Sequence, residues 1–295
     1  MTASTVDRPP ARGFFNSTPV RFFIFSVSLI ALDIGAQFAL ALASRRLPRL
    51  DPGLVTASVI LPACVLLLLL YAGLVRVLER RKPSELALDP GAGLAVAGTA
   101  GGVLLFSLVM AAFFALGVAR LAGGGDSSEI VVMALMAVLA AFAEELAVRG
   151  GVFRILEEGL GSLAALVLSA LLFGCMHLAN PGATLVSAAS IAVLGGLLLA
   201  AAYMATRSLW LPIGIHFGFN FAESGIFGAT LSGVQSHGGI WPVSIHGPQL
   251  LSGGAFGPEA SVVTVTINGL ATVVLLIVAV RRGEWRPLRL RLWAT

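Results

Sequence analysis

The chain has 295 residues, of which 57% are hydrophobic and only 12% are charged, and its mean hydropathy is +0.94. This composition lies far outside the range of soluble globular domains and predicts a polytopic membrane protein. The formal net charge is +4, but the basic residues lie beside long apolar runs, as they do next to membrane segments. We therefore expect the lipid bilayer as a partner and no nucleic acid.

Eight segments are candidates to cross the membrane, because a spanning helix needs about 20 mostly apolar residues. These segments are 22–43, 54–75, 93–118, 129–148, 162–179, 184–205, 208–227 and 261–280. The predicted fold is therefore an all-α integral membrane protein with about eight transmembrane helices. We expect a cytoplasmic leader at 1–21, one membrane domain at 22–280 and a basic cytoplasmic tail at 281–295.

The distribution of Lys and Arg predicts the orientation of these helices. With the N-terminus inside, the outer loops hold only four of the 19 Lys and Arg residues, namely Arg45, Arg46, Arg49 and Arg120. Cytoplasmic loops carry an excess of these residues. We expect both termini in the cytoplasm, in a multi-pass protein of the cell membrane, with the loop 228–260 on the far side.

Two adjacent glutamates, Glu144 and Glu145, lie near the end of an apolar segment that begins at Ile130. An ionised side chain in hydrocarbon costs about 2.5 to 3.5 kcal/mol even on lenient insertion scales, so carboxylates in such a place indicate a functional site. Arg149 follows Glu145 by one helical turn and can pair with it, whereas Glu144 is rotated by about 100° onto the neighbouring face. The spacing predicts one paired and one free glutamate.

Two of the four histidines fall within predicted spans. His177 follows Phe173 by one turn, and His216 precedes Asn220 by one turn. Together with the free glutamate in a desolvated pocket, such residues can hydrolyse a bond: the carboxylate takes a proton from water, an imidazole positions that water, and donors stabilise the oxyanion by about 2.7 to 4 kcal/mol each. No Ser or Cys has an evident base, so we expect water as the nucleophile.

The patterns Glu-Glu-x-x-x-Arg, Phe-x-x-x-His and His-x-x-x-Asn follow one another on successive hydrophobic segments. They resemble the three motifs of the CPBP intramembrane proteases, the family of CAAX prenyl endoproteases and of bacteriocin-processing or self-immunity (Abi) proteins. Asn180-Pro181 and the run 252–259 are also similar to that family. The resemblance is specific over about 129–225, and Val148 departs from it, because an aromatic residue usually precedes the arginine.

The resemblance implies an endopeptidase with an intramembrane catalytic cavity. Glu144 would activate water together with His177, while His216 and Asn220 would hold the oxyanion, and the paired glutamate and its arginine would support the site. The substrates implied are membrane-associated peptides or proteins, such as prenylated CAAX tails or peptides with a leader. The sequence itself names none of them.

The metal dependence of such a site stays open at this point. Members of the family are often labelled metalloproteases, and one Glu with two His makes a legitimate zinc set. If a zinc ion is present, its ligands are expected to be Glu144, His177 and His216. The sequence lacks His-Glu-x-x-His, and we favour a metal-free glutamate mechanism without a cofactor.

Two other classes of function are alternatives. A proton-coupled transporter also carries intramembrane Glu and His, but transporters usually show internal repeats, and the Glu-Glu-x-x-x-Arg segment has no second copy. The other alternative is a non-catalytic membrane partner or immunity protein of the same family. The intact set of motif residues argues against it.

Three structural expectations concern the surroundings of the site. The spacing of Gly98 and Gly102 permits close helix approach, and Asp33 is an intramembrane carboxylate with either a structural role or a place at the site. With the fourth span ending at 148, Glu144 and His177 would lie at different depths. This difference requires strongly tilted helices or a segment 150–161 that re-enters the membrane.

Overall fold

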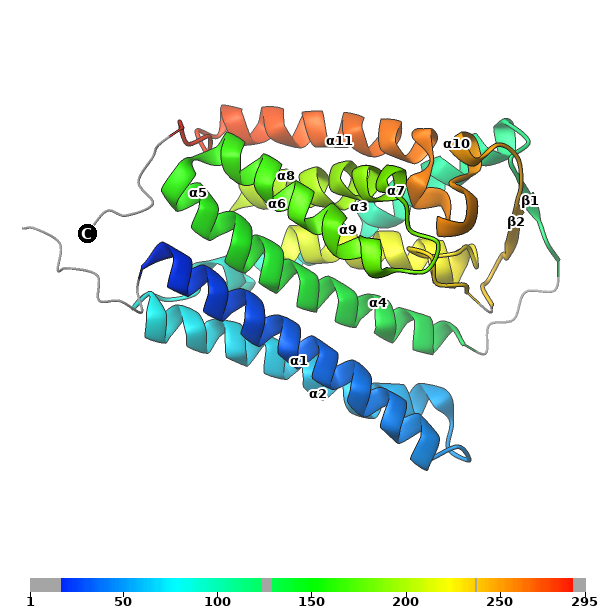
Figure 1. The fold of residues 1–295 in the computed structure, drawn as a ribbon, viewed down its shortest axis with the longest axis horizontal. Coiled ribbons are helices and arrows are strands. Elements are labelled where there is room, and N and C mark those ends of the chain that lie inside the picture. The colour runs from blue at the N-terminus through cyan, green and yellow to red at the C-terminus, as the bar shows by residue number, and fades with distance from the viewer. Residues whose placement is uncertain (1–16, 124–128, 237, 289–295) are drawn as a thin grey trace, which may run out of the picture.

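The computed structural model describes residues 17–123, 129–236 and 238–288, and this part of the chain is mostly helical (Figure 1). Seven of its helices are long and apolar enough to cross a membrane: Thr18–Arg46, Pro52–Leu78, Leu88–Ala115, Ile130–Leu160, Ser162–Ala179, Leu185–Thr206 and Val262–Arg281. The eighth predicted segment is also helical, from Trp210 to Ile226, but it is shorter than the others. The predicted fold class, an all-α integral membrane protein, is confirmed.

The elements can be followed in chain order in Figure 1. They are α1 (Thr18–Arg46), α2 (Pro52–Leu78), α3 (Leu88–Ala115), β1 (Ala119–Leu121), α4 (Ile130–Glu144), α5 (Arg154–Leu160), α6 (Ser162–Met176), α7 (Leu185–Ile191), α8 (Leu198–Thr206), α9 (Trp210–Phe221), β2 (Val243–Ile245), α10 (Gln249–Ser252) and α11 (Val262–Arg281). Short 3-10 turns occupy Ser84–Leu86, His177–Ala179, Gly254–Phe256 and Pro258–Ala260. Three π-helical stretches, Glu145–Phe153, Ala192–Leu197 and Ala222–Ile226, join helices or extend them.

The fourth membrane helix is longer than the sequence predicted. It continues without a break through the π-helical stretch past position 148 to Leu160, and the chain turns back at Gly161, whose φ is 87°. The segment 150–160 is therefore helical, and the re-entrant alternative is wrong. Glu144 and His177 each lie about 25 Å along their helices from this turn, at a rise of about 1.5 Å per residue. Their equal distances from the turn remove the difference in depth that a span ending at 148 would imply.

Helices α3 and α9 approach each other backbone to backbone. A Cβ atom built on Gly98 would lie 2.5 Å from the Leu211 carbonyl oxygen, and one on Gly102 would lie 2.2 Å from the Ile215 carbonyl oxygen. Gly214 on α9 meets α3 in the same way, 2.4 Å from a carbonyl oxygen. The predicted close approach of the third span is therefore present, and it sets the position of the helix that carries His216 and Asn220.

The two ends of the helical bundle differ in chemistry. At one end lie α10 and the short antiparallel pair β1–β2 (Figure 1); β1 belongs to the connection between α3 and α4, and β2 and α10 belong to the long connection between α9 and α11. At the other end a set of partly or fully buried charged side chains forms many ion pairs, for example between Arg154 and Glu79 at 2.7 Å and between Arg207 and Glu157 at 2.5 Å. We call this set the ionic network, and its members are Arg21, Glu79, Arg81, Glu85, Arg154, Glu157, Glu158, Arg207 and Glu284.

Candidate active site

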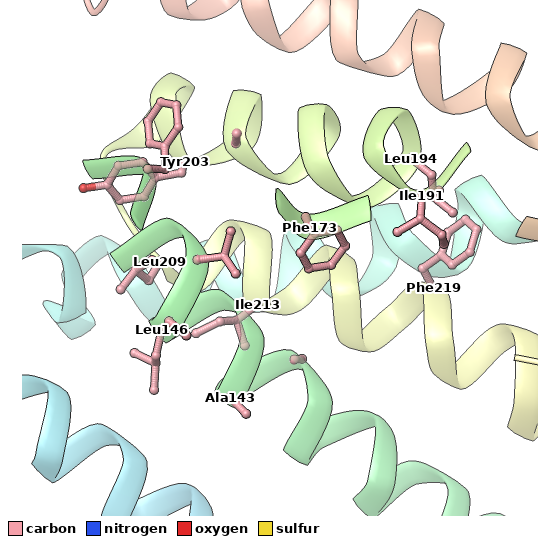
Figure 2. Packing of buried hydrophobic residues seen from close by; sticks show 14 of the residues in the cluster. Ala143, Leu146, Phe173, Ile191, Leu194, Tyr203, Leu209, Ile213 and Phe219 are labelled. Atoms are coloured by element: carbon pink, nitrogen blue, oxygen red, sulfur yellow. The ribbon is translucent and has the colours of Figure 1, made fainter. Parts of the chain in front are cut away.

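A cavity of about 400 Å³ lies between the helices, and all four predicted catalytic residues line it: Glu144, His177, His216 and Asn220. Its walls come from α4, α6, the α7–α8 helix and α9, and the loop 231–236 and Glu259 complete it at one end. Most of the remaining lining is apolar. Three of the apolar lining residues, Ile191, Leu194 and Phe219, lie close together (Figure 2).

The two neighbouring glutamates have different surroundings. Glu145 and Arg149 are fully buried, with Arg149 Nη1 donating to Glu145 Oε1 at 2.7 Å. The guanidinium also donates from Nη2 to the Gly195 carbonyl at 2.6 Å and lies 4.5 Å from the centre of the Phe173 ring. Glu144 instead lines the cavity, and its Oε2 has no hydrogen-bond partner in the described part of the chain. The structure thus contains the pairing that the helical spacing predicted.

Glu145 has a second contact that the sequence did not reveal. The Nδ1 atom of His216 lies 2.9 Å from Glu145 Oε1, the same oxygen that accepts from Arg149. A carboxylate can only accept, so Nδ1 carries a hydrogen, and the carboxylate fixes the tautomer and the orientation of the ring. His216 therefore presents Nε2 as its other polar atom. No local pattern could indicate this contact, because the two residues lie far apart in the sequence.

His177 is fixed in a similar way by its own helix. Its Nδ1 lies 2.9 Å from the carbonyl oxygen of Phe173, one turn earlier, and its ring lies 4.9 Å from the Phe173 ring, centre to centre. A carbonyl oxygen also only accepts, so Nδ1 is the protonated nitrogen of the neutral ring. Nε2 of His177 is left as an acceptor that can position a water molecule. Phe173 of the Phe-x-x-x-His pattern therefore orients the imidazole through its backbone.

The third membrane motif places an imidazole and an amide on one face of α9. His216 and Asn220 are separated by one turn, and each has only 8% of its surface exposed. The glycines at the contact between α9 and α3 leave no room for side chains there, so the polar face of α9 points to the cavity. Donors on both residues can then reach the same bound group.

Glu259 belongs to the site but to none of the three motifs. It lines the cavity, and it accepts hydrogen bonds from the Ser232 backbone N–H at 2.5 Å and from Ser232 Oγ at 2.7 Å. Asn180 Nδ2 donates to the Ser232 carbonyl at 3.0 Å, which ties the loop 231–236 to the end of α6 just after His177. Burial raises the pKa of Glu259, while the hydrogen bonds from Ser232 and the nearby imidazoles oppose that rise. The only sequence signal for this residue was the family-like run 252–259.

Asp33 lies on α1, close enough to Glu144 for the two carboxyl groups to interact electrostatically. It also accepts a hydrogen bond from Gln37 Nε2 at 2.9 Å. Asp33 is absent from the lining of the cavity. The hydrogen bond from Gln37 agrees with a structural role for Asp33. Its position near Glu144 also places a second carboxyl group beside the site.

The residues of the site do not make a metal centre in this arrangement. Within the ranges that the structure describes, no three side chains of His, Cys, Asp or Glu gather closely enough to hold a metal ion. The zinc set considered from the sequence, Glu144 with His177 and His216, does not meet that geometry. We therefore derive no step through a metal.

Several π-helical stretches adjoin the site. One begins at Glu145 and contains Arg149, the second contains Gly195 and Gly196, which accept from Arg149, and the third begins two residues after Asn220. Such departures from the α-helical register occur frequently at functional sites. In this chain the first two stretches contain the Glu145–Arg149 pair and the two glycines whose carbonyl groups accept hydrogen bonds from Arg149.

The fold and the cavity together define a multi-pass helical membrane protein with a polar site enclosed between its helices. Residues 126–222, which contain all three motifs, match the family model of Rce1-like proteins, described as type II CAAX prenyl endopeptidase Rce1-like. The resemblance to the CPBP intramembrane proteases is thereby confirmed for the segment that carries it. No curated protein and no solved structure matches the chain. Because the matched family is one of proteases, the match supports an enzyme.

Proposed function

We propose that this protein is an intramembrane endopeptidase that hydrolyses peptide bonds of membrane-associated substrates with water activated by a glutamate. The observation that carries the proposal is that the two adjacent glutamates have different surroundings. Oε2 of each glutamate has no hydrogen-bond partner among the described residues, but Glu145 is held through Oε1 by Arg149 and His216 and does not line the cavity, whereas Glu144 does. A base must have a free oxygen in the cavity to take a proton from water.

In this proposal Glu144 is the general base and His177 positions the attacking water. The Nδ1 atom of His177 is engaged by the Phe173 carbonyl, so its Nε2 is the atom that can accept a hydrogen bond from that water. The water oxygen attacks the carbonyl carbon of the peptide, its proton passes to Glu144, and the carbonyl oxygen becomes an oxyanion. The oxyanion then collapses to the carboxylic acid product, the C–N bond breaks, and protonated Glu144 delivers its proton to the leaving amine.

The oxyanion is assigned to His216 and Asn220. The Glu145 carboxylate at Nδ1 stabilises the His216 ring in its doubly protonated, cationic form, which donates from Nε2, and the amide of Asn220 supplies the second donor. Two preorganised donors of this kind contribute about 2.7 to 4 kcal/mol each to the stability of the transition state. Glu145 and Arg149 are positioning residues, because they act on the reaction through His216 and through the helix that carries Glu144.

The apolar walls of the cavity suit substrates that come from a membrane. Side chains such as Met136, Leu198 and Leu199 can contact an apolar residue or a lipid-like group beside the cut bond. Prenylated CAAX-type tails and peptides with a leader are the two substrate classes that we propose to test. We further propose that both termini are cytoplasmic, in agreement with the distribution of Lys and Arg.

The proposal can be tested with purified protein in liposomes. The probes are a farnesylated peptide with a CAAX end, the same peptide without the farnesyl group, and a leader peptide with one membrane anchor. Wild-type protein is expected to cut at least one of them at a defined bond, and Glu144→Gln is expected to cut none. If Glu144→Gln cuts as fast as the wild type, the role of Glu144 is refuted; if neither protein cuts any of the three, the proposed activity on these substrates is refuted.

A further inference from the structure

The loop 231–236 forms one wall of the cavity. Five of its six residues line the cavity: Leu231, Ser232, Val234, Gln235 and Ser236. The backbones of Leu231 and Val234 exchange hydrogen bonds of 2.9 and 2.8 Å, which close the turn. All six side chains are partly or fully exposed. The position of this wall therefore depends on polar contacts with other segments and not on burial of its own side chains.

Ser232 is held by hydrogen bonds from two sides. On one side, Glu259 Oε2 accepts from the backbone N–H of Ser232 at 2.5 Å and from its Oγ at 2.7 Å. On the other side, Asn180 Nδ2 donates to the Ser232 carbonyl at 3.0 Å, and the backbone N–H of Asn180 donates to the His177 carbonyl at 3.1 Å. One loop residue thus connects Glu259 with the end of the helix that carries His177.

The backbone of Ser232 needs this support. Its φ is 48°, in the left-handed region that residues other than glycine rarely adopt. Such a conformation persists only where the surrounding structure over-determines it, and it is found most often at functional sites. The three hydrogen bonds to Ser232 supply that determination. Without them the loop is free to relax to another conformation.

The residue after Ser232 lets two other segments close on the loop. Gly233 donates its backbone N–H to the Phe256 carbonyl at 2.7 Å, and a Cβ atom built on it would lie 1.9 Å from the Pro181 carbonyl oxygen. The loop is therefore packed between the Asn180-Pro181 turn and the run 252–259. Both segments lie outside the three motifs, and the proposed reaction uses neither of them.

The contacts of Glu259 distinguish two roles that a carboxyl group of the cavity can have. Among the described residues, its hydrogen bonds all go to Ser232, and they all fall on Oε2. With the imidazoles of His177 and His216 it interacts electrostatically and without a hydrogen bond. Its direct contacts are thus with the loop and not with the groups that act on water or the oxyanion.

We propose that Glu259 is a positioning residue of the peptidase, which through Ser232 fixes the loop 231–236 as the wall against which the substrate binds beside His177. This inference rests on the proposed peptidase function and deepens it, because it assigns the run 252–259 to substrate binding. Glu259 acts on the bound peptide through the loop.

Replacement of Glu259 by alanine or by glutamine separates its hydrogen bonds from its charge. Both bonds fall on one oxygen, so the amide oxygen of glutamine can accept both, whereas alanine accepts neither. We expect Glu259→Ala to raise the KM of a peptide that the wild type cuts by about tenfold and to change kcat by less than about threefold, because it removes binding that ground state and transition state share. Glu259→Gln should recover most of the lost affinity.

Two kinetic results would overturn the proposal. A fall in kcat of about 100-fold or more in both variants, with KM unchanged, would assign Glu259 to proton transfer. Equal rises of KM in the two variants would show that the charge carries the effect and that the hydrogen bonds do not.

Asn180→Ala releases the other side of Ser232 and should also raise KM. The double variant with Glu259→Ala should raise KM by less than the product of the two single factors, because both residues act on one loop. A rise equal to that product would show that the two residues act independently, against the proposal.

A spin label on the loop reports its mobility without any substrate. In full-length protein in liposomes, with Cys64→Ala and Cys175→Ala, the label is attached at Gln235→Cys, or at Lys82→Cys as a control outside the cavity lining. We expect Glu259→Ala to narrow the spectrum of the label at 235, Glu259→Gln to change it less, and neither to change the spectrum at 82.

An unchanged spectrum at 235 in Glu259→Ala, or an equal change at 82, would contradict the proposal. If neither the wild type nor any variant cuts a peptide, the peptidase function fails, while the spectra still decide whether Glu259 holds the loop. Melting temperature and gel filtration check that each variant is folded. Should Glu259→Ala not fold, Asn180→Ala takes its place in both measurements.

Discussion

Substitution of Glu145 by glutamine tests the different environments of the two glutamates. Glu145 and Arg149 are both fully buried, and Glu145 Oε1 accepts from Arg149 and from His216. Glu145→Gln leaves the Arg149 guanidinium without its counter-charge. Removing one partner of a buried ion pair typically costs about 3 to 5 kcal/mol.

The lower end of this range applies here, because Arg149 keeps its hydrogen bond to the Gly195 carbonyl and its contact with the Phe173 ring. A loss of about 3 kcal/mol, at roughly 2 °C for each kcal/mol in a chain of this size, lowers the melting temperature by about 6 °C. Glu144→Gln has a smaller effect, because Glu144 forms no ion pair in the described part of the chain, and its electrostatic interactions with Arg149 and with Asp33 have opposite signs. We expect its melting temperature to lie within about 2 °C of that of the wild type, which corresponds to about 1 kcal/mol.

The assay is thermal unfolding of the three variants in one detergent, followed by tryptophan fluorescence. The third variant combines Glu145→Gln with Arg149→Met, which leaves neither charge unpaired, and it should recover part of the lost stability. The reasoning is refuted if Glu144→Gln is the unstable variant, or if Glu145→Gln melts at the temperature of the wild type.

Three further predictions concern helix packing, pH and metal. Gly102→Ala places a Cβ 2.2 Å from a backbone carbonyl of α9, and it should lower turnover by about 100-fold by shifting the catalytic groups by roughly 1 Å. The control Gly101→Ala, whose Cβ meets nothing within 4 Å, should keep wild-type turnover. Equal turnover in the two variants would contradict this packing argument. Burial opposes ionisation of Glu85, but hydrogen bonds from an arginine and a tyrosine outweigh burial and lower the pKa of this carboxyl group. The ionised Glu85 therefore stabilises the fold fully above the pKa that it has in the unfolded chain. This stabilisation is lost as the pH falls through the pKa of Glu85 in the folded protein. The melting temperature of the wild type should consequently fall more steeply on acidification than that of Glu85→Gln, and parallel curves would disprove the assignment. Peptide cleavage should survive exhaustive chelation, because Glu144 and its imidazole partner can hold the water; bound zinc at one equivalent, with activity lost on chelation and restored by zinc, would contradict the metal-free mechanism.

The sequence predicted the fold class, and the four motif residues that it singled out line one cavity. Long apolar runs predict spanning helices directly, and the spacing of Glu145 and Arg149 predicts a contact within one helix. The motif residues also indicated which helices must meet around the cavity. These inferences depend on local periodicity, which the sequence displays.

The features that the sequence could not predict depend on contacts between distant segments or on departures from regular helix. The hydrogen bond from His216 to Glu145 joins two helices, and the bonds from Ser232 to Glu259 join two loops. The fourth helix extends past position 148, the predicted end of its span, because the buried charges of Arg149 and Arg154 have carboxylate and carbonyl partners within the bundle.

The most direct test of the central claim is the rate at which Glu144→Gln cuts a substrate of the wild-type protein under single-turnover conditions. Both proteins would be placed in the same liposomes, after their melting temperatures have been shown to agree. Because a general base contributes about 10²- to 10⁴-fold to the rate, we predict a loss of at least 100-fold at the same scissile bond. A rate within about tenfold of the wild type would show that Glu144 is not the base and would contradict the mechanism.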